Sequence, residues 1–265
     1  MRSTAYRLTS FTVVASALGF LLRWLQTLRI IDEETGLAAR GMGISVLVTL
    51  VIAIVAAAMA FLSWQLKRMN APLAPEIAFK NASWIENAAA WAVAALFFVS
   101  AVMQLLTLDS WGETQLGIRR VFALATFAAA AGTAILTLYA QKPEKGGFCR
   151  VGSVLLIAFG ALWLIAVYKA AASNPVIWSF AIEVLAVCAS LLSFYYIAGW
   201  FFGEPNPKRA VFCCHFGAFL SIMAAGDDHT IAEGICFAAV AAAQLLWGFL
   251  IVSNHTFASE GEHAK

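Results

Sequence analysis

The residue best placed to do chemistry in this chain is Glu183, a carboxylate inside a long apolar stretch from Pro175 to Gly203. The apolar residues of this stretch favour membrane insertion by about 4–7 kcal/mol in total, whereas one acid at the centre of a helix costs about 2.5–3.5 kcal/mol. The stretch is therefore expected to insert. Glu183 must then be protonated, paired with a cation or in contact with water.

Helical spacing places Glu183 on one face with four small residues of the same stretch, Ser179, Ala186, Ser190 and Ser193. A narrow stripe of small and polar residues is expected to face protein rather than lipid. Three interpretations of Glu183 stay open: a structural hydrogen bond between helices, a site for a solute, ion or proton, and a neutral acid exposed to lipid. We take Glu183, Ser179 and Ser190 as candidate substrate-binding residues.

A second charge inside an apolar stretch is Arg23, about five residues from the outer end of the first expected helix. Glu183 lies eight residues from Pro175, and therefore deeper in the membrane than Arg23. The long Arg23 side chain covers part of this difference in depth, which predicts an Arg23–Glu183 ion pair. The alternative is that Arg23 extends to the outer head groups, as arginines near helix ends often do.

The pattern E-T-x-L-x-x-R occurs twice, from Glu34 to Arg40 and from Glu113 to Arg119. Each copy directly precedes a helix that starts on the outer side, which suggests a two-helix repeat of 8–65 and 84–140. The functional interpretation is an outer vestibule with two acids and two bases, which adds Glu34, Arg40, Glu113 and Arg119 to the candidate binding residues. The alternative is that the threonines start helices and the arginines anchor at head groups.

Asp228, His229 and Glu233 form the densest polar cluster and are weak candidates for a divalent metal site. A capping box of Thr230 and Glu233 explains the same residues without a metal. His215 stands alone in its expected helix, whereas a bis-histidine haem needs two such residues. We therefore predict no cofactor. The chain also lacks short hydrolase, protease and ATPase motifs, which argues against an enzyme.

Composition predicts an all-α polytopic membrane protein, because 62% of residues are hydrophobic and 12% are charged, against roughly 25% charged in soluble domains. The apolar runs are continuous, which excludes an outer-membrane barrel. A net charge of +2 does not suggest nucleic acid. We expect one membrane domain, 1–265, in the lipid bilayer of the cell membrane. Its eight helices are expected at about 8–28, 43–65, 84–107, 118–140, 149–171, 175–202, 208–224 and 230–253.

Local signals support these boundaries and give an orientation. Ser83 to Glu86 reads as a capping box, and Asn174 and Asn206 each precede a proline at a helix start. Lysines and arginines gather on the side of the N-terminus, which places both termini in the cytoplasm. The first helix is expected to remain uncleaved, and the five cysteines are expected to be free thiols.

These features favour a small-solute permease or a substrate-binding membrane subunit with a site between helices near Glu183. The alternative is a non-transporting membrane sensor or assembly subunit, in which the charges anchor helices to one another. A membrane-embedded enzyme fits least well. The expected partners are the lipid bilayer, a small solute, and either a second copy of the chain or another membrane subunit.

Overall fold

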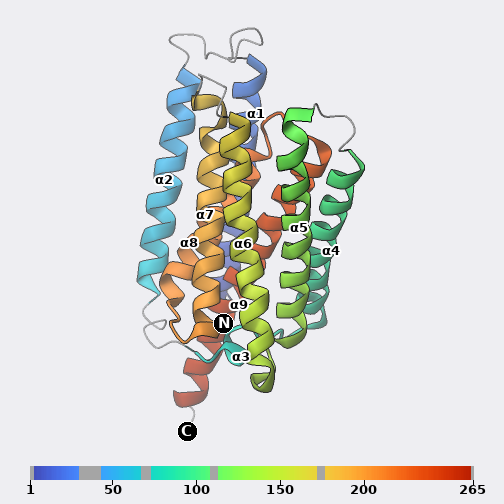
Figure 1. The fold of residues 1–265 in the computed structure, drawn as a ribbon. Coiled ribbons are helices and arrows are strands. Elements are labelled where there is room, and N and C mark those ends of the chain that lie inside the picture. The colour runs from blue at the N-terminus through green and yellow to red at the C-terminus, as the bar shows by residue number, and fades with distance from the viewer. Residues whose placement is uncertain (1–2, 30–42, 67–72, 108–112, 172–176, 264–265) are drawn as a thin grey trace.

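The computed structural model describes residues 3–29, 43–66, 73–107, 113–171 and 177–263, and within these ranges it is a bundle of long helices (Figure 1). The long helices are α1 (Ser3–Arg29), α2 (Gly43–Gln65), α4 (Trp84–Leu106), α5 (Glu113–Tyr139), α6 (Gly146–Ala171), α7 (Ile177–Phe202), α8 (Pro207–Ala224) and α9 (Ile231–His263). Two short elements complete the described part, α3 (Pro75–Ala78) and the 3-10 turn η3 (Pro143–Lys145).

The prediction of an all-α polytopic membrane protein is confirmed. Within the described ranges, seven helices are long and apolar enough to cross a bilayer, namely all the long helices except α8. The expected eighth span, 208–224, is not among these seven; it corresponds to α8, which has 18 residues, most of them buried within the bundle. Helices α1 and α5 each begin five residues earlier than expected, and α9 runs ten residues further. The short elements α3 and η3 were not predicted, because they carry no long apolar run.

Three of the predicted helix caps are present, and the fourth, at Asn174, lies outside the described residues. The Ser83 hydroxyl accepts the backbone N–H of Glu86, and the Glu86 carboxylate accepts the backbone N–H of Ser83, both at 3.3 Å. Asn206 accepts the N–H of Arg209 at the start of α8. Thr230 and Glu233 form the same reciprocal box at the start of α9. These bonds satisfy N–H groups that the first helical turn leaves unpaired.

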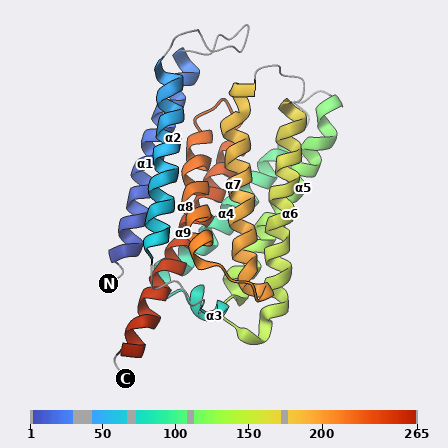
Figure 2. The same ribbon diagram turned by 90° about the vertical axis from the view of Figure 1, so that its left-hand side faces the viewer.

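Six helices form a closed ring. Each helix from α4 to α9 packs against the next one, and α9 packs back against α4. Helix α1 packs against α8 and α9 outside this ring, and α2 packs against α1 and α8 at the edge of the bundle (Figure 2). Helix α1 begins and α9 ends at the same end of the bundle (Figure 1). We call this the terminal end and the opposite one the distal end.

Aromatic side chains fill the interior of the ring. Phe159 of α6 contacts Phe97 of α4, Phe122 of α5 and Phe194 of α7, with ring centroids 5.6–6.4 Å apart. Trp163 of α6 contacts Phe237 of α9 at 4.8 Å. These side chains are all buried. Large aromatic surfaces contribute strongly to packing, so this cluster holds five helices together and closes the space between them.

At the terminal end, Asn254 of α9 ties down the segment that contains α3. Its side-chain amide donates to the carbonyl oxygens of Ala78 and Lys80, both at 3.0 Å. Replacing Asn254 with leucine leaves these two carbonyl groups without that donor, which costs about 1–3 kcal/mol for a buried group. We expect faster tryptic cleavage after Lys80 in the detergent-solubilised variant. Asn87→Ala, at an exposed position of α4, serves as control and should be cleaved at the wild-type rate.

Candidate functional site

Two acid–base pairs hold the start of α9 and the turn before it at the distal end. Arg23 of α1 pairs with Asp227, and Arg119 of α5 pairs with Glu233. The Arg23 side chain is 2% exposed and also donates to the Gln26 amide oxygen at 3.0 Å. Residues 227–233 are thereby fixed to α1 on one side and to α5 on the other.

The structure corrects the expected partner of Arg23. Its carboxylate partner in the structure is Asp227, which follows α8, rather than Glu183 of α7. Its side chain is buried beside the turn between α8 and α9, and its expected extension to the outer head groups stays a prediction. The physical reason is that Asp227 lies at the distal end of the helix directly packed on α1, and an ion pair there avoids an isolated buried guanidinium group.

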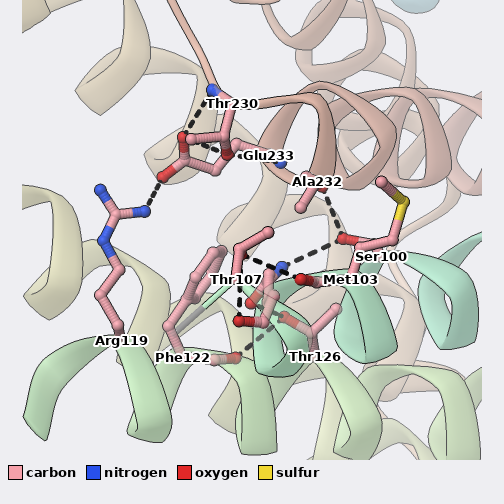
Figure 3. A network of polar contacts seen from close by, with 10 residues as sticks. Ser100, Met103, Thr107, Arg119, Phe122, Thr126, Thr230, Ala232 and Glu233 are labelled. Atoms are coloured by element: carbon pink, nitrogen blue, oxygen red, sulfur yellow. Dashed lines mark hydrogen bonds and ion pairs between the residues drawn. The ribbon is translucent and has the colours of Figure 1, made fainter. Parts of the chain in front are cut away.

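The Arg119–Glu233 pair belongs to a wider polar network between α4, α5 and α9 (Figure 3). Glu233 also accepts the hydroxyl of Thr230 at 2.8 Å. Ser100 of α4 donates to the carbonyl oxygen of Ala232 at 2.7 Å and accepts the amide N–H of Gln104 at 3.0 Å. This network joins the start of α9 to the last turns of α4.

A small cleft opens beside this network. It is lined by Gln104, Thr107, Arg119 and Thr230 and leaves about 10 Å³ for the centre of a water molecule. That is roughly the space that one water needs. Its walls carry an amide, two hydroxyl groups and a guanidinium group, so it suits a small polar group rather than an apolar one.

Glu183 lies less than two turns into α7 and is half-buried. The charged side chains that act on it are Glu233, Asp227 and Arg119. No hydrogen bond to its carboxylate is present among the described residues. We call Glu183, Asp227, Glu233, Arg23 and Arg119 the distal charge cluster.

The distal charge cluster has three carboxylates and two guanidinium groups, so full ionisation leaves one negative charge in excess. One member of the cluster, Asp227, lies in the turn outside the helices. Burial raises its pKa above the ordinary value, although Arg23 and His229 act in the opposite direction. The cluster therefore favours uptake of positive charge, either a proton or a small cation.

The other predicted binding residues are placed differently or lie outside the described part. Ser190 is buried, donates to the carbonyl oxygen of Ala186 at 2.7 Å, and lies 3.3 Å from the Ser221 hydroxyl oxygen. Glu34 and Arg40 lie outside the described residues, as do the side chains of Ser179 and Glu113. The vestibule with two acids and two bases and the two-helix repeat stay predictions.

The weak metal candidates do not converge in the described structure. No group of three or more His, Cys, Asp or Glu side chains suited to a metal ion occurs among the described residues. His229 donates through Nε2 to the carbonyl oxygen of Ala224 at 3.1 Å and packs against Phe237. Glu233 is bound to Arg119 and Thr230, and Asp228 is exposed. The helix-capping interpretation of Thr230 and Glu233 is confirmed.

Sequence reasoning missed Asp227 and Gln104 as parts of the site. Asp227 is 204 positions from Arg23 in the sequence, and a separation of this length gives no pattern to detect. Gln104 is an uncharged polar residue about one turn from the end of its helix, and Ser100 lies one turn before it on the same face. This pair of polar residues on one helix face was the signal that could have identified Gln104.

Comparisons with family models, with curated proteins and with solved structures find no match for this chain. The distal charge cluster and its cleft therefore have to be interpreted from their own chemistry.

Proposed function

We propose that the protein is a small-solute permease of the cell membrane, or the solute-binding subunit of one, with its site at the distal end beside Glu183. The observation that carries this proposal is the state of Glu183 itself. It is a half-buried carboxylate without a hydrogen bond in the described structure, next to two complete acid–base pairs. The excess negative charge favours a cation, or a neutral solute with N–H donors, over an anion.

The surroundings of Glu183 support a polar ligand. The neighbouring cleft offers the Gln104 amide, the hydroxyl groups of Thr107 and Thr230, and the Arg119 guanidinium group. Ligand sites in helix bundles are built from a few such polar groups between helices. Lysines and arginines gather on the side of the two termini, which is the terminal end of the bundle. The distal end would therefore face the outside of the cell.

The aromatic interior favours a second candidate function, a membrane sensor that binds a solute without moving it. Trp163 contacts Phe237, and the His229 ring packs on Phe237 at 4.9 Å. These rings lie at the distal end of the aromatic cluster and close the ring of six helices there. A permease has to move them, whereas a sensor does not.

Ligand-dependent thermal stabilisation tests the proposal. The purified protein is screened against metal cations, amines, amino acids and sugars, and the screen is repeated with Glu183→Gln. We expect a solute that stabilises the wild type, by about 2.7 kcal/mol at a concentration of 100 Kd, and has no effect on Glu183→Gln. Glu144→Gln, at an exposed acid in η3, is the matched control and should keep the effect.

The outcomes of this screen have distinct meanings. A stabilising solute that acts equally on Glu183→Gln contradicts the placement of the site. Uptake of the stabilising solute into proteoliposomes then separates the two candidates. Accumulation that Glu183→Gln abolishes supports the permease, and binding without uptake supports the sensor.

A further inference from the structure

A second small cavity lies inside the ring of six helices, at its terminal end. Its walls come from α4, α5, α7 and α9 and from the segment 73–83, which contains α3. It leaves about 20 Å³ for the centre of a water molecule, which is little more than one water needs. Polar groups in its wall come from Asn81, Thr137 and Gln141. We call this cavity the terminal chamber; as it stands it is too small for a solute.

The terminal chamber and the distal cleft lie at opposite ends of the same three helices. Both are lined by residues of α4, α5 and α9. On α5, Arg119 of the cleft and Thr137 of the chamber are 18 residues apart, which is about 27 Å along a helix at 1.5 Å per residue. The aromatic cluster lies between them, and Trp247 of the chamber wall contacts Phe194 of that cluster at 6.1 Å. A route through the ring would therefore have the cleft and the chamber as its two ends.

The segment 73–83 lies across the terminal end of the ring, as the position of α3 in both views shows (Figures 1 and 2). Its Phe79 side chain is buried. The Phe79 ring stacks on Phe201 of α7 at 5.5 Å and meets Trp200 edge-on at 5.4 Å. Phe79 and Phe201 both line the terminal chamber. The Phe79 ring therefore closes part of the chamber from the terminal side.

A few side chains hold this segment against the ring. The Asn254 amide of α9 donates to the carbonyl oxygens of Ala78 and Lys80, and Phe79 packs on α7. The Trp200 indole N–H, next to the Phe79 ring, is buried without a hydrogen-bond partner in the described structure. An unpaired buried donor is unfavourable, so the closed position carries a cost that hydration of Trp200 would remove. The segment can separate from the ring without breaking any long helix.

We propose that the segment 73–83 is a lid on the terminal end of the solute path, with Phe79 as its closing side chain and Asn254 as its latch. Opening breaks the two hydrogen bonds of the Asn254 amide and withdraws Phe79 from α7. The terminal chamber then joins the water at that end, and a solute that entered beside Glu183 leaves there. This role in solute exit rests on the proposed function, whereas opening of the lid does not.

Thiol labelling of the purified full-length protein tests the opening of the lid. Ala140→Cys places a thiol in the chamber wall, at a buried position of α5. When opening and closing are faster than labelling, the rate of labelling by a water-soluble maleimide follows the population of the open form. We expect slow labelling of Ala140→Cys and roughly tenfold faster labelling when Asn254→Leu is added, because the latch is lost. Glu144→Gln, at an exposed position of the same end, is the matched control and should leave the rate unchanged.

The native cysteines distinguish opening of the lid from unfolding. Cys214 and Cys236 are fully buried in the bundle, and mass spectrometry measures the labelling of each cysteine separately. We expect both to stay unlabelled in every variant. The lid is overturned if Asn254→Leu leaves the labelling rate of the introduced thiol unchanged. It is also overturned if Cys214 and Cys236 become labelled as fast as that thiol, since the segment then opens only when the whole bundle does.

A cross-link tests the role of the lid in solute exit. Phe79→Cys combined with Phe201→Cys gives two thiols at positions whose rings are in contact, and a short bis-maleimide joins them. We expect cross-linking to stop uptake into proteoliposomes while thermal stabilisation by the same solute persists. Each single variant, treated with the same reagent, should keep its uptake. Unchanged uptake after cross-linking overturns the role in exit. Absence of uptake by the wild type contradicts the permease alone, because thiol labelling decides the lid independently.

Discussion

Replacing Arg23 with methionine should lower the free energy of unfolding at neutral pH by about 3–5 kcal/mol, because it removes the cation from a largely buried carboxylate. The Asp227 side chain is 11% exposed, and its Oδ2 atom already lacks a hydrogen bond in the described structure. Arg23 also donates to Gln26, which in turn donates to Ser45 of α2. The loss is measured by denaturant unfolding in detergent, with tryptophan fluorescence as the signal for unfolding.

The deficit of Arg23→Met should depend on pH. Burial raises the pKa of Asp227, and Arg23 opposes this increase, so removal of Arg23 raises that pKa further. An acid with a higher pKa in the folded state binds more protons when folded, so the free energy of unfolding falls as pH rises above about 4. The difference from wild type should therefore be largest at neutral pH and shrink towards pH 4.

A double substitution gives the control for this prediction. Arg23→Met combined with Asp227→Leu removes both charges, and it should recover most of the loss and all of the added pH dependence. Equal stability of Arg23→Met and wild type at neutral pH would contradict a buried ion pair at this position.

Replacing Gly132 with alanine should destabilise the contact between α5 and α6 by about 1–3 kcal/mol. A Cβ atom at Gly132 would lie 2.6 Å from the carbonyl oxygen of Gly152, and one at Gly152 would lie 3.1 Å from the carbonyl oxygen of Gly132. Backbone atoms cannot move aside as a flexible side chain can, so the two helices must separate. The expected result is a lower midpoint of denaturant unfolding.

Gly117→Ala provides a matched control on the same helix. No atom lies within 4 Å of the Cβ position at Gly117, so alanine fits there without displacement. Alanine favours a helix over glycine by up to about 1 kcal/mol, and this variant should be as stable as the wild type or more stable. If both variants changed stability in the same direction and by the same amount, helix propensity rather than the α5–α6 contact would explain the effect at Gly132.

The positions of the long helices could be predicted because each depends on a local signal. An apolar run of sufficient length gave the span, and residues such as Ser83, Asn206 and Thr230 gave the starts. Helix α3 has four residues and contains Pro75, so no comparable signal existed. Its position depends on Asn254, more than 170 residues further along the chain.

The partners within the site could not be predicted for the same reason. Closure of the ring brings Ser100 of α4 against Ala232 of α9, and this packing depends on the shapes of many side chains. Glu183 was recognised because a charge in an apolar run is costly at any position. The pairing of Arg23 was misjudged because helical depth alone cannot say which helices are neighbours.

The long sequence separation of the Arg23–Asp227 pair has a consequence for how the protein is made. Asp227 follows Arg23 by 204 residues, and ribosomes add about 5–20 residues per second. Roughly 10–40 s therefore pass between synthesis of the two side chains. During that interval α1 and α2 are in the membrane while α8, the helix on which both pack, has not yet emerged. The nascent α1–α2 pair must therefore accommodate Arg23 in the membrane without Asp227 until the turn between α8 and α9 has been synthesised.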